Sequence, residues 1–173
     1  MSTLLVASIL VALVAAVCFM LVHLDNKQKR KAMNHLLDQF SQAGSLLQFT
    51  FSSQEILKDA ILGLDGARRK LVVVKRSSEN VYNTLVIDLF AVNRCSVKKQ
   101  YGTINSGELK TRKPEQYLEE IVLHFEVAYK EPVEIVFYKH FDNHLTEIAE
   151  LEAKAKQWET ILSKMIAPLK KTA

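Results

Sequence analysis

The stretch AILGLDGARRKLVVVKR, residues 60–76, decides the fold that the sequence predicts. Two apolar runs, 60–64 and 70–76, flank a polar corner at Asp65-Gly66, and the second run is rich in valine. Valine suits a pleated strand, and an Asp-Gly pair suits a reversal of the chain. We therefore predict two antiparallel strands joined by a loop that is longer than a two-residue hairpin turn.

Strand-like patterns continue on both sides of this hairpin. Before it, SLLQFTF (45–51) alternates apolar and polar residues and predicts a strand, while SSQEILKD (52–59) predicts one helical turn capped by a serine. After it, VYNTLVIDLFAV (81–92) and NRCSVKKQYGTI (93–104) predict two strands, or one bent strand with a bulge near Asp88.

The second half of the sheet follows an exposed loop. Residues 105–117 combine glycine, proline and charge, which is typical of a loop. EEIVLHFEV (119–127) and VEIVFYKH (133–140) then predict the last hairpin, with His124 on its polar, solvent-facing side. The total is about seven short strands.

The final segment is predicted to be one long amphipathic helix, residues 143–170. Its apolar residues recur at intervals of three and four: Leu145, Ile148, Leu151, Ala155, Trp158, Leu162, Met165 and Leu169. A coiled coil has similar spacing, but Ala155 and Trp158 favour docking on a sheet over a regular zipper seam. Leu151, Trp158 and Leu162 are therefore expected to pack on the core of the β domain.

At the other end of the chain, residues 1–24 are predicted to be a transmembrane anchor. Residues 4–24 carry no formal charge and are interrupted only by Ser8, Cys18 and His23. This run matches the ~20 residues that a helix needs to cross a bilayer. A cleaved signal peptide is the alternative, but no basic residue precedes the run, which is also longer than the usual apolar core of ~7–15 residues.

Basic residues follow the apolar run directly: Lys27, Lys29, Arg30 and Lys31. Positive charge is retained on the cytoplasmic side of a membrane, so we expect the N-terminus outside and the bulk of the chain inside. Apolar residues at three- and four-residue spacing predict a short amphipathic helix over 25–44, stopped by Gly44. Residues 45–173 then form the β domain.

This order of about seven strands and one long helix resembles a pleckstrin-homology-like domain. The resemblance is carried by the hairpin AILGLDGARRKLVVV (60–74), the pair LVIDLFAVNRCSV (85–97) and the helix LEAKAKQWETIL (151–162). It implies an α+β fold in which an antiparallel β-barrel or sandwich is capped by the helix, with Trp158 buried at the open end of the barrel. Small bacterial single-pass proteins with such domains are similar over the whole length, and most have no assigned activity.

Basic residues gather at two predicted loops. The first group is Arg68, Arg69 and Lys70 with Lys75 and Arg76 nearby, and the second is Lys110, Arg112 and Lys113. Guanidinium groups suit phosphates and anionic headgroups, and the resemblance makes the first group the better candidate for such a site. The Lys-x(n)-Arg-x-Arg spacing of inositol-phosphate sites is absent, so a solvated basic surface is the other interpretation.

No motif predicts catalysis, a cofactor or a metal. HFDNH (140–144) contains metal-capable side chains, but thiolates are lacking and Asp142 suits a helix cap better. Cys95 is predicted to be a buried structural thiol that does not bridge to Cys18 in the anchor. No phosphate-binding loop, GxSxG or HExxH occurs. A modest net charge of +4 with acidic residues throughout does not predict nucleic acid binding.

These observations predict a binding protein and not an enzyme. We expect a single-pass protein of the inner membrane whose cytoplasmic pleckstrin-homology-like domain recruits or organises a protein partner. Two alternatives stay open. Either the basic hairpin binds an anionic lipid headgroup, or the anchor and the juxtamembrane helix assemble copies of the chain into a structural subunit.

Overall fold

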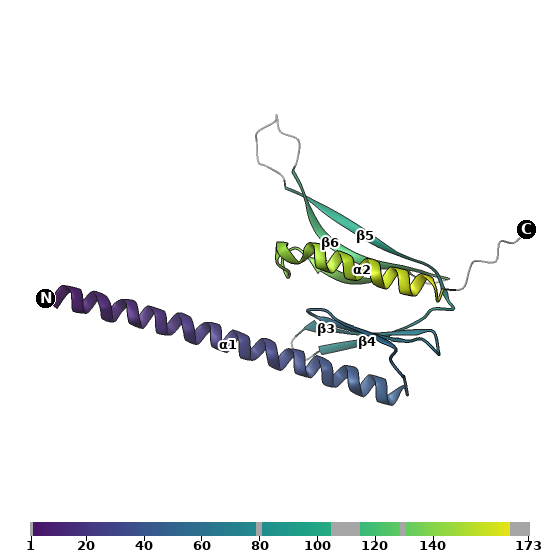
Figure 1. The fold of residues 1–173 in the computed structure, drawn as a ribbon, viewed down its shortest axis with the longest axis horizontal. Coiled ribbons are helices and arrows are strands. Elements are labelled where there is room, and N and C mark those ends of the chain that lie inside the picture. The colour runs from purple at the N-terminus through teal and green to yellow at the C-terminus, as the bar shows by residue number, and fades with distance from the viewer. Residues whose placement is uncertain (1, 79–80, 105–114, 129–130, 167–173) are drawn as a thin grey trace, which may run out of the picture.

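The computed structural model describes residues 2–78, 81–104, 115–128 and 131–166 (Figure 1). One long helix, α1 (Ser2–Leu46), comes first, and a short 3-10 turn, η1 (Leu145–Glu147), leads into the last helix, α2 (Ile148–Ser163). Seven strands lie between them: β1 (Ser53–Ile56), β2 (Ala60–Asp65), β3 (Lys70–Ser78), β4 (Val81–Asp88), β5 (Val92–Ile104), β6 (Glu115–Val127) and β7 (Val133–Lys139). The fold is α+β, as the sequence predicts.

The strands form two antiparallel sheets. One has the order β1-β2-β3-β4 and the other the order β5-β6-β7. The predicted hairpin at 60–76 is confirmed, because β2 pairs with β3 from Ala60 opposite Lys75 to Asp65 opposite Lys70. No ladder joins the two sheets within the ranges given above, so the strands form a two-sheet sandwich and not a closed barrel.

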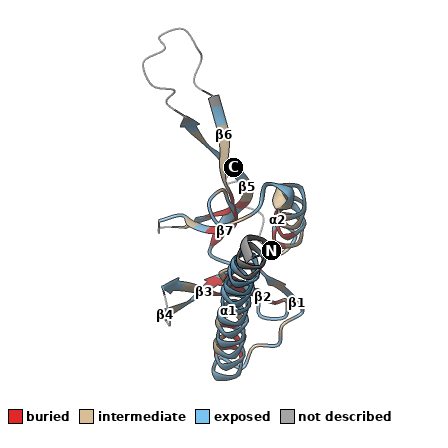
Figure 2. Cartoon of the chain, turned by 90° about the vertical axis from the view of Figure 1, so that its left-hand side faces the viewer, coloured by how far each residue is buried: buried red, intermediate tan, exposed pale blue. Residues whose placement is uncertain are grey.

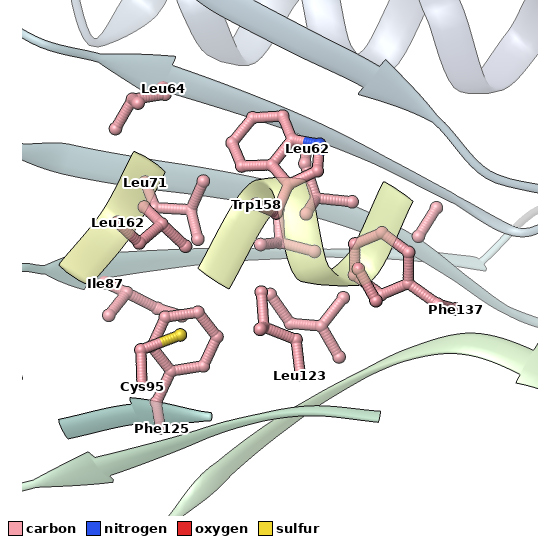
Figure 3. Close-up of a cluster of buried hydrophobic side chains, with 14 of the residues drawn as sticks. Leu62, Leu64, Leu71, Ile87, Cys95, Leu123, Phe125, Phe137, Trp158 and Leu162 are labelled. Atoms are coloured by element: carbon pink, nitrogen blue, oxygen red, sulfur yellow. The ribbon is translucent and has the colours of Figure 1, made fainter. Parts of the chain in front are cut away.

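The main core lies between the two sheets, and α2 closes one side of it (Figure 3). The inner faces of the sheets contribute Leu62, Leu64, Leu71, Val73, Ile121, Leu123, Phe125 and Phe137. Helix α2 inserts Ala155, Trp158 and Leu162, all buried, and Leu151 packs at the edge. These are the helix positions at which the periodicity places the docking face, and together they remove a large apolar area from water.

The second core lies on the outer face of the four-stranded sheet, against α1. The helix contributes Leu36, Phe40 and Ala43, and the sheet contributes Ile61, Val72 and Val74. Strands β2 and β3 are therefore covered on both faces, which explains why each is a nearly continuous apolar run instead of an alternating one. Close approach needs Gly63, because a Cβ built there would lie 2.5 Å from Cζ of Phe40.

Helix α1 runs without a break through the predicted anchor (1–24) and the predicted amphipathic helix (25–44). The first glycine or proline of the chain is Gly44, so nothing before it breaks the helix. Gly44 does not end the helix either. It makes room for Phe51, whose Cε2 atom would lie 2.8 Å from a Cβ at this position.

The predicted strand at 45–51 is wrong. Helix α1 occupies its first residues, and the chain then reverses at Gln48, which has a φ of 51°. The alternation in the sequence has another cause: Phe49 and Phe51 both pack against the α1 side of the sheet. The ring of Phe51 stacks on Phe40 with 4.6 Å between centroids.

The helical turn predicted for 52–59 is also wrong, because this segment contains β1, which pairs with β2. Ser52 does not cap a helix; its hydroxyl donates a hydrogen bond of 3.0 Å to the carbonyl of Leu64 on β2. The amide of Leu57 donates to the carbonyl of Ala60 and closes the β1–β2 turn. A short edge strand carries little apolar signal of its own.

His124 is buried, contrary to the surface position that the alternation predicts. Strand β6 is the middle strand of its sheet, so Ser96 and Glu134 lie directly opposite His124 on the two neighbouring strands. Nδ1 of His124 lies 2.9 Å from Oε1 of Glu134. Cross-strand neighbours of this kind cover a polar face that a single strand would expose.

The last helix is shorter at both ends than the predicted range 143–170. Asn143 precedes η1, and its side-chain amide donates a hydrogen bond of 2.9 Å to Oε2 of Glu147. Regular helix begins at Ile148 and ends at Ser163. The end of the predicted range, from residue 167 onward, lies outside the described residues, as do residues 105–114 of the predicted loop. Residues 115–117, the last of that loop, instead belong to β6.

Replacing Phe40 by alanine should destabilise the protein by about 3–5 kcal/mol, because it empties the contact between α1 and the sheet. The matched control is Leu37→Ala on the exposed side of the same helix, which should change stability by less than about 0.5 kcal/mol. Denaturant titration of the full chain in detergent, followed by circular dichroism, measures both. Equal midpoints for the two variants would contradict this packing.

Candidate functional site

Helix α2 closes only one of the two open sides of the sandwich. It bridges the edge strands β1 and β5: Nε1 of Trp158 donates a 3.4 Å hydrogen bond to Oε2 of Glu55, and the amide of Val97 donates to Oε1 of Glu159 at 3.3 Å. Ion pairs from Lys154 to Glu55 (3.2 Å) and Lys99 to Glu152 (2.7 Å) add to this seam. Figure 2 shows α2 and β1 on one side, and β4 and β7 on the other.

The opposite side contains a cavity of about 450 Å³ between β3–β4 and β7, which we call the β4–β7 groove. Its apolar lining consists of Leu57, Ala60, Val73, Leu85, Ile135, Val136 and Phe137. Most of these side chains also belong to the main core. The groove is therefore a place where the interior of the sandwich opens to the surface.

Both strands that flank the groove are edge strands. In the described sheets β4 pairs only with β3, and β7 pairs only with β6. Each strand leaves one row of backbone N–H and C=O groups without a neighbouring strand. Such an edge can accept an added strand from another polypeptide.

The rim of the groove carries both signs of charge. Arg76 is paired with Asp59, and the ammonium group of Lys58 donates to the backbone carbonyl of Asp142. Lys75 also lines the groove, is exposed, and forms no ion pair with any described residue. It is the group on this rim that is best placed to pair with an acidic side chain of a ligand.

The structure divides the first predicted basic group between opposite ends of β3. Arg68 and Arg69 lie in the β2–β3 turn with Lys70 at the start of β3, whereas Lys75 and Arg76 lie near its other end. The separation along the strand is about 20 Å at ~3.3 Å per residue. One headgroup therefore cannot contact all five side chains.

The arginines of the β2–β3 turn have structural contacts. Arg68 donates a hydrogen bond of 3.0 Å to the carbonyl of Leu47 and lies 5.7 Å from the ring centroid of Phe49. Arg69 lies 5.1 Å from the ring of Phe90. Backbone hydrogen bonds, from Arg68 at 2.9 Å above all and also from Thr50, hold the pKa of Asp65 below its usual value. These contacts fix the turn against the end of α1.

The two ends of β3 lie beside different parts of α1. A cavity of about 650 Å³ separates the helix residues Asp25, Lys29, Lys31 and His35 from Asp59, Arg76 and Tyr82. The β1–β2 turn and the last residues of β3 therefore face residues 25–35 of α1, while the β2–β3 turn lies beside Leu47, after the helix has ended. We call the first of these ends the anchor-facing end of the domain.

The basic residues that follow the predicted anchor, Lys27, Lys29, Arg30 and Lys31, are exposed on α1. Only Lys29 forms an ion pair with a described residue, at 2.6 Å to Asp25 one turn earlier. They form a cationic collar next to the apolar part of the helix. The second basic group, Lys110, Arg112 and Lys113, lies outside the described residues.

The described residues offer no clear catalytic or metal-binding set. Burial raises the pKa of the Cys95 thiol to about 12, with the carboxylate of Glu159 acting in the same direction. A thiolate is therefore scarce at neutral pH. No group of three metal-ligating side chains occurs among the described residues. Within HFDNH, the ring of His140 is tilted against Tyr117 and meets Phe141 edge-on.

The groove combines residues that are far apart in the sequence. Leu85 belongs to β4, and Ile135 and Phe137 belong to β7 of the other sheet. A comparison with family models, curated proteins and solved structures finds no match for the chain. What the site can do must therefore be inferred from its own geometry.

Cys95 should resist thiol reagents in the folded protein. Its raised pKa lowers the thiolate fraction by about a thousand-fold relative to the ordinary value of 9.0. In a Cys18→Ser variant, we expect maleimide labelling at neutral pH to be at least ~100-fold slower in the native state than in denaturant. Similar rates in the two states would show that Cys95 is accessible.

Proposed function

We propose that this chain is a single-pass membrane-anchored interaction module whose β4–β7 groove binds an extended segment of a partner protein. The observation that carries this proposal is the groove itself: an apolar lining between two edge strands, on the one side of the sandwich that α2 leaves open. A bound segment would add a strand to β4 or β7 and place alternate side chains on the apolar lining.

The anchor part of the proposal rests on α1. One helix of the described chain is long and apolar enough to cross a membrane, and its most apolar window is entirely exposed in the folded monomer. Exposed apolar surface of this extent is costly in water and favourable in lipid. The cationic collar that follows supports a cytoplasmic location of the domain. The resemblance to small bacterial single-pass proteins is the basis for assigning the anchor to the inner membrane of a bacterial cell.

The fold also supports the comparison with pleckstrin-homology-like domains. Seven strands in sheets of four and three are followed by one helix, and the tryptophan of that helix is buried against the sandwich. Fold alone does not define a ligand, so the proposed binding mode depends on the groove. It is a binding function without a chemical step.

A photoreactive amino acid at Leu85 should crosslink the partner in intact membranes, and one at Val86 should not. The two side chains are equally exposed, at 40% each, but Leu85 lies opposite Val73 on the groove side and Val86 lies opposite Val72 on the α1 side. Mass spectrometry of the crosslinked product identifies the bound segment.

The same pair of positions supplies the control by mutation. With the photoreactive group moved to Asn83, Leu85→Asp should reduce the crosslink at least ~10-fold, because a carboxylate cannot be buried on the apolar lining. Val86→Asp should leave it unchanged. Equal crosslinking from Leu85 and Val86, or none from either, would contradict binding in the groove.

The topology of the anchor is tested by reporter fusions after residue 173. A fluorescent protein that matures only in the cytoplasm should be bright, and alkaline phosphatase at the same place should be inactive, because the collar holds its side of α1 inside. Replacing Lys27, Lys29, Arg30 and Lys31 with glutamine should weaken this preference. An active phosphatase fusion of the unchanged chain would place the domain outside.

A further inference from the structure

The turn between β7 and α2 carries large apolar side chains that the fold does not cover. Phe141 is 79% exposed and Leu145 is 66% exposed. The ring of His140 meets the ring of Phe141 edge-on, with 5.3 Å between centroids. It is tilted against the ring of Tyr117 on β6, with 4.8 Å between centroids. We call these four residues the aromatic tip.

The aromatic tip lies at the anchor-facing end of the domain. Lys58 of the β1–β2 turn donates a hydrogen bond to the carbonyl of Asp142, so this turn and the tip are neighbours. The next residue, Asp59, lines the cavity against α1. Figure 1 shows α2 beginning at the end of the domain that points towards the N-terminus of α1.

This position is close to the surface of the bilayer that α1 would cross. The helix residues that line the shared cavity, 25–35, follow the apolar run within about 17 Å at 1.5 Å per residue. The headgroup layer takes up ~5–8 Å of that distance on each side of the hydrocarbon core. Transmembrane helices tilt by ~20° on average, which lowers one side of an attached domain towards the membrane.

The chemistry of this end fits a bilayer interface. Aromatic rings are enriched at the headgroup level, where an apolar body can be buried beside polar groups. Three lysines surround the tip or line the adjoining groove, Lys58, Lys75 and Lys139, and the cationic collar of α1 lies on the same end. Each basic group near an anionic surface contributes about 1 kcal/mol of attraction.

We propose that the aromatic tip is a second membrane contact, with Phe141 and Leu145 inserted at the headgroup level of the bilayer that holds α1. This inference rests on the proposed anchor. Two contacts fix the rotation of the domain about the axis of α1, and they decide which way the β4–β7 groove faces. The basic residues of the β2–β3 turn, at the far end of the domain, take no part.

The test places an environment-sensitive fluorophore on a single cysteine at Phe141→Cys in the full chain, with Cys18→Ser to remove the reactive native thiol. Cys95 is buried and does not compete for the label. The control is Phe90→Cys, another exposed phenylalanine, at 62% exposure in the β4–β5 turn, next to Arg69 at the far end. Nanodiscs are made from equal parts of phosphatidylcholine and phosphatidylglycerol.

Spin labels on the lipid headgroups should quench the fluorophore at position 141 several-fold more than at position 90. A label at Leu145→Cys should behave like the one at 141, which guards against a local effect of one substitution. Equal quenching at 141 and 90 overturns the proposal. A blue-shifted emission at 141 without lipid quenching also overturns it, because the tip is then covered by protein.

A separate label distinguishes failure of this inference from failure of the anchor. Cys18 of the unchanged chain lies in the apolar part of α1 and is exposed. A fluorophore there should be quenched by spin labels deep in the acyl chains. Deep quenching at Cys18 without quenching at 141 removes only the second contact, whereas no quenching at Cys18 removes the anchor on which it depends.

Discussion

The packing of α1 on the outer face of the four-stranded sheet is the interaction on which the rest of the structure depends. Phe40 and Phe51 stack over Gly63, and Leu36 lies beside them on the same apolar surface. Buried side chains, and not only the connecting segment 47–52, hold the helix against the sheet. The segment that would enter the membrane and the domain that would bind a partner are therefore one body, in which the position of each is set by the other.

The open groove follows from the way in which the sandwich is closed. Two stacked sheets leave two open sides, and a single helix with one apolar stripe covers one of them. Because α1 covers an outer face and not the remaining side, the lining at Val73, Ile135 and Phe137 reaches the surface between β4 and β7. Because neither helix covers this side, β4 and β7 also remain edge strands. An apolar groove beside an unpaired strand edge is what strand addition requires.

The sequence predicts those parts of the fold in which a local apolar pattern arises from burial against a single neighbouring element. The hairpin at 60–76, the strands of the second sheet and the docking face around Trp158 are local periodicities that burial on one partner explains. The strand predicted at 45–51 failed because Phe49 and Phe51 alternate to fit α1, a partner that a local pattern does not reveal. The continuous apolar runs of β2 and β3 are the signal of a second covering layer. The groove was beyond prediction, since Leu85 and Phe137 meet only after two sheets have packed.

Helix α1 has no glycine or proline before Gly44, and its 45 residues form one rod about 68 Å long. A domain joined to its anchor by a flexible linker could take any orientation relative to the membrane. With a rigid helix, the orientation of the domain follows the tilt angle of the helix. In a thicker or thinner bilayer α1 would adopt a different tilt angle. The whole sandwich would then rotate with the helix as a rigid body. The physical state of the membrane would then set how the partner-binding surface is presented, without any change in the shape of the domain.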